Sequence, residues 1–142
     1  MPKTILLTGA NGQLGRSIYL ELSPFYNVIP SIYKNISNFS LFNGKEVRLD
    51  IANKLEIKNI YDKINPNIII NTAALTDVDY CEKEKEKAIN INVNSVKHFL
   101  SVIKKRTLFI QISTDYVFDG ISGGYSEKNA TYPETYYGKT KL

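Results

Sequence analysis

A tyrosine and a lysine near the end of the chain have the spacing of a proton-transfer pair. Tyr137 and Lys141 lie four residues apart, and on a helix this spacing places both side chains on one face. A phenol titrates near pH ~10, so it transfers protons at neutral pH more readily when an ammonium group stabilises the phenolate. The pair therefore predicts general acid–base chemistry, with an incidental pair on an ordinary polar helix as the alternative.

Thr114 supplies a hydroxyl group for the same chemistry. With Ser113 it follows the apolar run 108–112, which indicates a strand and puts the hydroxyl at that strand's carboxyl end. There it would hydrogen-bond a substrate carbonyl or hydroxyl and fix it for proton transfer. We therefore expect the catalytic set to be Thr114, Tyr137 and Lys141.

A glycine-rich loop lies near the start of the chain, where residues 9–15 read Gly-Ala-Asn-Gly-Gln-Leu-Gly. It follows a short apolar run and opens into a pattern with helical spacing. Glycines there let the backbone approach a pyrophosphate, while N–H groups at the helix start face the negative charge. The loop predicts dinucleotide binding, and a tight turn without a ligand is the alternative.

The end of the second predicted strand bears on which dinucleotide binds. In such folds an acid about 20 residues beyond the loop bonds the ribose 2′-hydroxyl and favours NAD. Residues 31–34 read Ser-Ile-Tyr-Lys and contain no acid. Lys34 could instead meet the 2′-phosphate of NADPH, and a solvated turn residue is an equal alternative.

Alternating strands and helices must position these residues. We expect strands at 4–8, 28–33, 46–49, 67–71 and 108–112, a first helix ended by Pro24, and helices over 54–64 and 82–104. An irregular Asn/Ser-rich stretch separates the second and third strands. This alternation indicates parallel βαβ units with right-handed crossovers. The predicted fold is α/β, a Rossmann-type doubly wound parallel sheet whose ligands bind beyond the carboxyl ends of the strands.

Composition and charge exclude several classes of protein. With 43% hydrophobic and 23% charged residues, the 142-residue chain has the material for one packed domain. It lacks the roughly 18 consecutive apolar residues of a membrane span, and it lacks a signal peptide, so we expect a cytoplasmic location. The net charge of +4 is spread among acids rather than gathered in a stripe, which argues against nucleic-acid binding.

Cys81 and His98 are the only residues of their types. One thiol cannot form an internal disulfide, and one imidazole argues against a metal site, so we expect no metal. Both are interpreted as packing or surface residues. The loop from Gly120 to Pro133 is long enough to cover a substrate, and the sequence leaves its role open.

Together these motifs resemble those of the dTDP-4-dehydrorhamnose reductase family, within the extended short-chain dehydrogenases/reductases. The similarity covers essentially all 142 residues. The most diagnostic block is residues 112–120, Ile-Ser-Thr-Asp-Tyr-Val-Phe-Asp-Gly, followed by Pro133 and by Tyr-Gly-Lys-Thr-Lys-Leu at 137–142. The glycine loop and residues 66–79 are also similar, but the glycine motif is shared across the superfamily.

The resemblance implies an activity and a set of binding residues. Hydride would pass from NADPH or NADH to the C4 carbonyl of a dTDP-linked 4-keto-6-deoxy sugar as Tyr137 protonates the oxygen, giving dTDP-rhamnose for cell-surface polysaccharide. Asn92 would be the asparagine that supports the active site from behind. Because Asn90 and Asn94 lie two residues away on either side, which of the three has this role is left open. Asp50 would lie at the adenine, or would cap the helix that begins near Asn53. The implied cofactor-binding residues are Gly9, Asn11, Gly12, Gln13, Leu14, Asp50, Ile51, Ala73, Ala74, Thr76, Tyr137 and Lys141.

The chain is shorter than the family it resembles, whose members run to roughly twice this length. Residues 1–142 would then form an incomplete NAD(P)-binding domain without the substrate-binding lobe. We expect its sheet to end in an uncovered edge and a helix beginning near Glu134 to lie unburied. We also expect weak or no turnover from this chain alone, and a homodimer is left open.

Two other functions stay open. One is a non-catalytic binding or regulatory module of the same fold, like the regulatory subunit of methionine adenosyltransferase, although the retained Tyr137 and Lys141 favour the enzyme. The other is an epimerase or dehydratase acting on another nucleotide sugar. Those enzymes usually carry Ser-Ser where this chain has Ser113-Thr114, and dehydratases need an acidic pair. Asp115 is present but no Glu follows it, which argues against dehydration.

Overall fold

The computed structural model describes residues 2–34 and 40–142, so part of the Asn/Ser-rich stretch lies outside the described residues. The chain divides into two compact units. Unit 1 comprises the chain up to Ala73 together with Ser95–Ile112, and unit 2 comprises Ala74–Asn94 and Ser113–Leu142. Each unit has a buried cluster of its own side chains.

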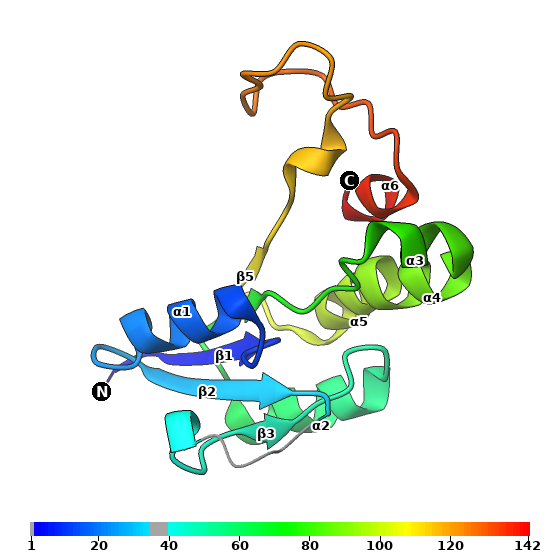
Figure 1. Ribbon diagram of the computed structural model, residues 1–142. Helices are drawn as coiled ribbons and strands as arrows, with labels where there is room; N and C mark the ends of the chain where they lie inside the picture. Colours follow the sequence, from blue (N-terminus) through cyan, green and yellow to red (C-terminus); the bar gives the residue numbers. More distant parts are fainter. Residues whose placement is uncertain (1, 35–39) are drawn as a thin grey trace. The chain divides into compact units, whose positions relative to one another are not determined.

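Unit 1 is built on a five-stranded sheet in which every pairing is parallel. The strands lie in the order β3-β2-β1-β4-β5 (Figure 1). Their bounds are Thr4–Thr8 for β1, Asn27–Ile32 for β2, Val47–Arg48 for β3, Ile68–Asn71 for β4 and Leu108–Gln111 for β5. Because the strands are parallel, their carboxyl ends meet at one edge of the sheet, where the glycine loop begins. The predicted Rossmann-type sheet is confirmed, with each strand within two residues of its expected bounds.

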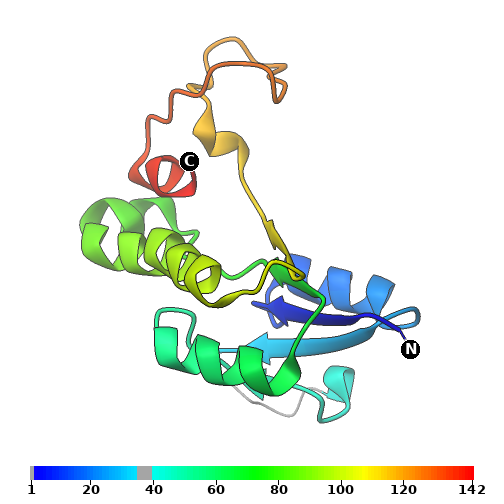
Figure 2. The ribbon, with the colours of Figure 1, turned by 180° about the vertical axis from the view of Figure 1, so that it is seen from behind.

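Helices cover both faces of this sheet. Helix α1 (Gln13–Leu22) lies on one face, and α2 (Lys54–Ile64) and α5 (Ser95–Val102) lie on the other (Figures 1 and 2). The short 3₁₀ turn η1 (Ser40–Phe42) adds Phe42 to the core beside Tyr19 of α1, with the two rings edge to face at 4.8 Å. Side chains alternate along β1, so Ile5 and Leu7 join this cluster on the α1 side.

Helix α2 has the bounds that the sequence predicts, because both of its ends carry local signals. The side chain of Asn53 accepts hydrogen bonds from the N–H groups of Leu55 and Glu56 and caps the helix start. Asn65 ends the helix in the left-handed conformation, with φ of 49°, just before Pro66.

The outer strand β5 leaves part of the sheet uncovered. Leu108 and Ile110 are 56% and 38% exposed, which is high for aliphatic residues of a strand. Between α1 and the β4–β5 face lies a hollow of about 370 Å³, lined by Ser17, Ile18, Glu21, Leu22, Ile70, Ile110 and Ile112. Strand β5 is an outer strand of the described sheet, and we call this hollow the apolar groove.

Unit 2 corrects the prediction of one long helix over 82–104. The helical run begins earlier, with α3 (Val78–Lys83), and breaks at Glu84, whose backbone is non-helical at φ −112° and ψ 58°. It resumes as α4 (Lys85–Ile89), passes through a π-helical turn η2 (Asn90–Asn94) and continues as α5 in unit 1. Asp77 sets the early start by accepting a hydrogen bond from the N–H of Tyr80.

The last helix of unit 2 is also a correction. It was expected to lie unburied, but α6 (Tyr136–Lys141) packs against α3 and α4 and buries Tyr137, Gly138 and Thr140. Its first N–H groups have two partners, because Thr135 caps Gly138 and the carboxylate of Glu82 accepts from the N–H of Tyr136 at 2.6 Å. The charged run 82–87 is exposed, as expected, and Glu82 within it holds the start of α6.

Candidate active site

The glycine loop of unit 1 packs too closely for any larger residue. Gly9 has φ of +64°, and a Cβ there would lie 2.8 Å from the backbone nitrogen of Ala73. A Cβ on Gly15 would lie 2.3 Å from the carbonyl oxygen of Gly9, so the helix start is pressed against the loop. These approaches need glycine.

The start of α1 is open to an anion. Gly12 is the N-cap residue and no side chain caps the helix start among the described residues. In a ten-residue helix the first N–H groups carry partial positive charge and have no intrahelical acceptor. The predicted residues Gly9, Asn11, Gly12, Gln13 and Leu14 surround this helix start, so the loop fits a pyrophosphate.

Asp50 and Ile51 lie beyond β3, at the same edge of the sheet. The alternative that Asp50 caps α2 is wrong, because Asn53 is the capping residue. Asp50 instead accepts a hydrogen bond from the N–H of Ala52 at 2.9 Å, while its own N–H donates to Glu56 at 2.9 Å. Ile51 is 8% exposed. A role for either residue at the adenine stays a prediction.

The residues expected beside the nicotinamide ribose follow β4. Ala73 belongs to unit 1, where its N–H donates to the hydroxyl of Thr8 at 3.4 Å. Ala74 and Thr76 belong to unit 2; Ala74 is partly exposed and Thr76 is exposed. These positions leave the side chains accessible, and their ribose contact stays a prediction.

Unit 2 brings the predicted catalytic residues together. Thr114 is the N-cap of the 3₁₀ turn η3 (Asp115–Val117), where its hydroxyl accepts from the N–H of Tyr116 at 3.3 Å. The same hydroxyl donates to the carboxylate of Asp115 at 3.2 Å, and Thr114 also lowers the pKa of the Tyr137 phenol against the larger effect of burial. Lys141 lies one helical turn after Tyr137 on α6. A hydroxyl, a phenol and an amine are therefore available within one unit.

A glycine permits this arrangement. Gly138 is buried, and a Cβ there would lie 2.2 Å from the carbonyl oxygen of Tyr116 and 3.0 Å from Cβ of Pro133. Helix α6 can therefore press against η3, where the rings of Tyr116 and Tyr137 meet edge to face with centroids 5.6 Å apart. The sequence analysis quoted Gly138 within the family motif but assigned it no role.

Burial shifts the pKa of both members of the pair, and stabilisation of the phenolate by Lys141 stays a prediction. Burial raises the pKa of the Tyr137 phenol, the hydrogen bond with Thr114 opposes this rise, and the nearby Asp115 adds to it. Burial also lowers the pKa of Lys141, because a low-dielectric surrounding disfavours its ammonium form. In unit 2 the phenol therefore holds its proton more firmly than a solvated tyrosine and is protonated at neutral pH.

Asn92 ties the elements behind Tyr137 together. Its side-chain oxygen accepts from the N–H of Leu75 at 2.8 Å, and its amide donates to the carbonyl of Leu75 at 3.0 Å and to the hydroxyl of Thr140 at 2.9 Å. Asn92 is buried and Asn90 is exposed, so the register left open by the sequence is resolved in favour of Asn92. Sequence reasoning missed Thr140, which lies three residues after Tyr137 and donates to its carbonyl at 2.8 Å.

The segment after η3 closes on itself through one side chain. The ring of Phe118 stacks on Tyr125 with centroids 4.6 Å apart and planes 5° from parallel. The hydroxyl of Tyr125 donates to Asp119 and accepts from the N–H of Ser122 at 2.9 Å. The bond from Tyr125 lowers the pKa of Asp119. We call this arrangement the Asp119–Tyr125 clasp; only the Gly-Gly pair at 123–124 hinted at such a turn in the sequence.

The described residues were also considered for a metal-binding cluster and for a membrane-spanning helix, and they contain neither. Residues 2–34 and 40–142 contain no group of three or more His, Cys, Asp or Glu side chains arranged to hold a metal ion. None of the helices in this part of the chain is both long enough and apolar enough to cross a membrane.

Known proteins are similar to this chain in sequence and in fold. The pattern of the family described as RmlD substrate binding domain matches residues 3–142. A dTDP-4-dehydrorhamnose reductase from Aggregatibacter actinomycetemcomitans is 38% identical over 141 residues, which cover 96% of this chain and 44% of that protein. Methionine adenosyltransferase 2 subunit beta from Danio rerio is 31% identical, over 99% of this chain and 42% of its own length.

Solved structures agree with this similarity. The hypothetical dTDP-4-dehydrorhamnose reductase from Sulfolobus tokodaii superposes with a TM-score of 0.86 at 40% identity, over 97% of this chain and 49% of that one. The dTDP-4-dehydrorhamnose reductase from Bacillus anthracis, in complex with NADP, gives a TM-score of 0.83 at 35% identity, over 99% and 47% of the two chains. The chain thus spans a little less than half the length of these relatives.

Proposed function

Because the chain belongs to the RmlD substrate-binding-domain family, we propose that it supplies the cofactor-binding and proton-transfer part of an NAD(P)H-dependent reductase. The proposed substrate is a dTDP-linked 4-keto-6-deoxy sugar, reduced to dTDP-rhamnose for polysaccharide synthesis. Relatives named dTDP-4-dehydrorhamnose reductase support this substrate class. The nicotinamide cofactor supplies the hydride.

The glycine loop would hold the cofactor through backbone groups. The N–H groups at the start of α1 would face the pyrophosphate. Gly9 and Gly15 allow the loop to pack against Ala73 and against the helix start, where a Cβ would clash with backbone atoms. Asp50 and Ile51 would border the adenine, and Ala73, Ala74 and Thr76 would border the nicotinamide ribose. This division of roles is the one that the sequence resemblance implies.

Three side chains would carry out the proton transfer. Thr114 hydrogen-bonds the substrate oxygen at C4 and fixes it beside Tyr137. Tyr137 gives its proton to that oxygen as negative charge develops there. The ammonium form of Lys141 stabilises the phenolate left behind.

The observation that carries the proposal is that Tyr137 is buried on α6 against η3, the turn that Thr114 caps, with Lys141 one turn further along α6. Residues with perturbed pKa values gather at functional sites, and burial shifts the pKa of both Tyr137 and Lys141.

The proposal is tested in two steps. The 142-residue chain is first assayed alone with NADPH and the 4-keto sugar nucleotide, and weak or no turnover is expected. It is then joined to the C-terminal part of the Aggregatibacter relative, and turnover is expected to appear. In that fusion, Tyr137→Phe should lower kcat by roughly 100-fold or more, since one general acid is lost, whereas exposed Tyr132→Phe should leave it unchanged.

Either of two results would contradict the proposal. One is ordinary turnover by the chain alone, which would show that no further part of the fold is needed. The other is a folded, NADPH-binding fusion in which Tyr137→Phe keeps full activity. Circular dichroism of each variant separates loss of folding from loss of chemistry.

A second function has support from specific relatives. Methionine adenosyltransferase 2 subunit beta proteins from Danio rerio and Xenopus laevis are 31% and 33% identical to this chain. A binding module of that kind would retain the glycine loop and bind a partner without transferring hydride. Co-purification with a methionine adenosyltransferase catalytic subunit, together with an inactive fusion, would favour this function.

A further inference from the structure

Two asparagines of the chain are followed by glycine, Asn11-Gly12 in the glycine loop and Asn43-Gly44 after η1. Such a pair reacts in water without an enzyme, because glycine has no side chain to hinder the reaction. The backbone nitrogen of the glycine loses its proton and attacks Cγ of the asparagine side chain, which closes a succinimide ring and releases the amide nitrogen as ammonia. Water then opens the ring and leaves aspartate or isoaspartate.

The turn after η1 holds Asn43 and Gly44 in a left-handed conformation. Their φ angles are 50° and 71°, and the N–H of Lys45 donates to the carbonyl of Phe42 at 3.0 Å to close the turn. Positive φ at both central residues is typical of a type I′ turn. The closing bond uses the nitrogen of Lys45, so the nitrogen of Gly44 is not needed to hold the turn.

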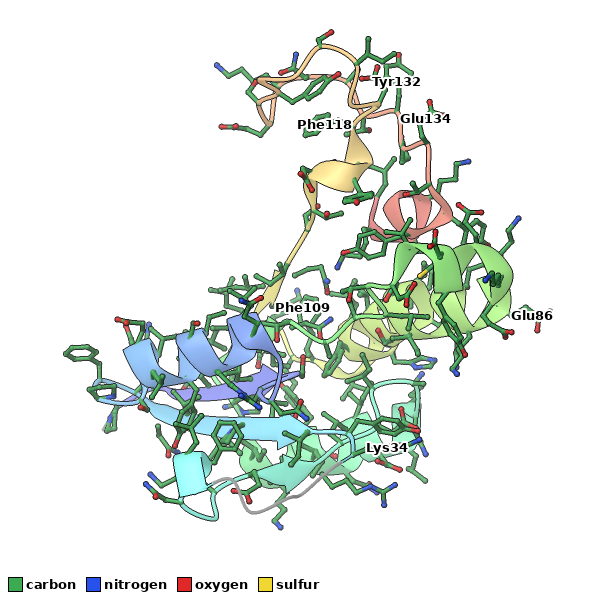
Figure 3. The ribbon with its side chains drawn as sticks, viewed as in Figure 1. Lys34, Glu86, Phe109, Phe118, Tyr132 and Glu134 are labelled. Carbon is green, nitrogen blue, oxygen red and sulfur yellow. The ribbon has the colours of Figure 1, made fainter. Side chains whose placement is uncertain are left out.

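The surroundings of this turn leave room for the reaction. Both Asn43 and Gly44 are exposed, and among the described residues no heavy atom lies within 4 Å of the position that a Cβ on Gly44 would take. Figure 3 shows η1 and this turn, in cyan, at the outer rim of unit 1. A rotation that brings Cγ of Asn43 to the nitrogen of Gly44 therefore needs only a local opening of the turn.

The pair Asn11-Gly12 is held against the same reaction. The N–H of Gly12 donates to the carbonyl of Gly9 at 2.9 Å, and the carbonyl of Gly12 accepts from the N–H of Arg16 at 3.0 Å. The first of these bonds must break before the glycine nitrogen can lose its proton and attack. A Cβ on Gly12 would also lie 3.2 Å from the carbonyl oxygen of Gly9, so the loop is tightly folded there. Asn11 therefore reacts only in molecules in which the start of α1 has opened.

We propose that Asn43 is a site of spontaneous deamidation, and that the fold directs the reaction to Asn43 and away from Asn11. A carboxylate at residue 11 would lie in the loop that fits a pyrophosphate and would repel it. At residue 43 the product adds a negative charge, and isoaspartate also adds a carbon to the main chain. This change comes directly after Phe42, whose ring packs against Tyr19 in the core. The inference holds whether or not the chain binds a dinucleotide.

Ageing of the folded 142-residue chain in mildly alkaline buffer tests the inference, because the attacking nitrogen must lose its proton. Mass spectrometry of proteolytic peptides gives the rate of conversion at each asparagine, and methylation by an isoaspartyl methyltransferase detects isoaspartate. We expect Asn43 to react roughly tenfold faster than Asn11, or more, since only Asn11 must wait for the helix start to open. In guanidinium chloride, which unfolds both segments, the two rates should be similar.

Asn43→Gln is the variant that removes the proposed site. Glutamine keeps the amide, but its extra methylene enlarges the ring that must close, so most of the isoaspartate should disappear. Asn129→Gln is the matched control, because Asn129 is exposed and is followed by Ala130, whose methyl group hinders the attack. It should leave the amount of isoaspartate unchanged. Circular dichroism shows that both variants are folded.

Three results would overturn the inference. One is a rate at Asn11 equal to or above the rate at Asn43 in the folded chain. Another is an unchanged yield of isoaspartate in folded Asn43→Gln. The third is a preference for Asn43 that persists to the same extent in guanidinium chloride, because the preference would then belong to the local sequence and not to the fold.

Discussion

The side-chain amide of Asn92 donates a hydrogen bond to the hydroxyl of Thr140 across 2.9 Å, and that hydroxyl donates in turn to the backbone carbonyl of Tyr137. Asn92 also bonds both backbone groups of Leu75. One buried amide therefore connects the π-helical turn, the segment after β4 and the helix that carries the proposed general acid. Its function is to position Tyr137 rather than to react.

Replacing Asn92 should destabilise this part of unit 2. In Asn92→Ala the N–H and carbonyl of Leu75 lose their buried partners, so we expect a loss of about 1–3 kcal/mol in the free energy of unfolding. Urea denaturation measures the loss, and hydrogen exchange at the Leu75 amide locates it. Asn90→Ala, at an exposed position of the same turn, is the control and should have a much smaller effect. Equal effects of the two changes would contradict the positioning role.

Adding one methyl group at residue 138 should separate α6 from η3. The new Cβ of Gly138→Ala would lie 2.2 Å from the carbonyl oxygen of Tyr116, a backbone atom that cannot move away alone. We expect a loss of about 1–3 kcal/mol in stability from this overpacking, together with loss of the contact between the Tyr116 and Tyr137 rings. Near-ultraviolet circular dichroism reports the ring contact. Lys139→Ala, exposed on the same helix, should change neither quantity.

The hydrogen bond with Thr114 lowers the pKa of Tyr137 against the larger effect of burial. Thr114→Val removes the hydroxyl, so the pKa of this phenol should rise further. Tyrosine ¹³Cζ chemical shifts followed against pH measure the change, with Tyr137→Phe assigning the signal and Thr131→Val as control. A fall in the pKa of Tyr137 in Thr114→Val would contradict this reading.

The raised pKa of Tyr137 also has a consequence for stability at high pH. The folded state holds the phenolic proton more tightly than the unfolded chain, whose phenol titrates near 10.0. The contribution to stability is therefore fully present below pH ~10 and is lost as the pH rises through the folded-state pKa. Tyr137→Phe removes this titration, so its unfolding free energy should fall less steeply in that range.

The Cys81 thiol should report on the packing beneath Tyr137. Cys81 is fully buried in a cluster with Ala88 and Tyr137, and burial raises its pKa. A raised pKa and lack of access both slow attack on a disulfide reagent, so we expect modification roughly 100-fold slower than in the urea-unfolded chain. Tyr137→Ala should speed the reaction, and exposed Tyr132→Ala should not. Fast modification of the native thiol would show that the cluster is open.

The parts predicted correctly from the sequence are those encoded by nearby residues. Helix α2 has its own cap at Asn53 and its own stop at Asn65-Pro66, so its bounds follow from local chemistry. The glycine loop was recognisable because its three glycines stand between a strand and a helix. Residues 68–70 are three isoleucines between Asn67 and Asn71, which is typical of a buried central strand.

The parts that were missed depend on contacts between distant segments. The break at Glu84 and the π-helical turn leave no pattern in a run of alternating charges and asparagines. The turn places Asn92 where its amide meets Leu75, 17 residues away. The rise in the pKa of Tyr137 follows from burial by surrounding residues, whereas the sequence showed only the lysine four residues on. The Asp119–Tyr125 clasp likewise joins residues whose pairing has no sequence signature.

The apolar groove between α1 and the β4–β5 face affects how folding of this chain can be judged in solution. Five aliphatic side chains line the groove in the folded state: Ile18, Leu22, Ile70, Ile110 and Ile112. A fluorescent dye such as anilinonaphthalene sulfonate, which brightens on hydrophobic surface, would find such surface on the fully native molecule. Bright dye would therefore be mistaken for a molten globule, and a sharp, cooperative melting transition is the better sign that the chain has folded.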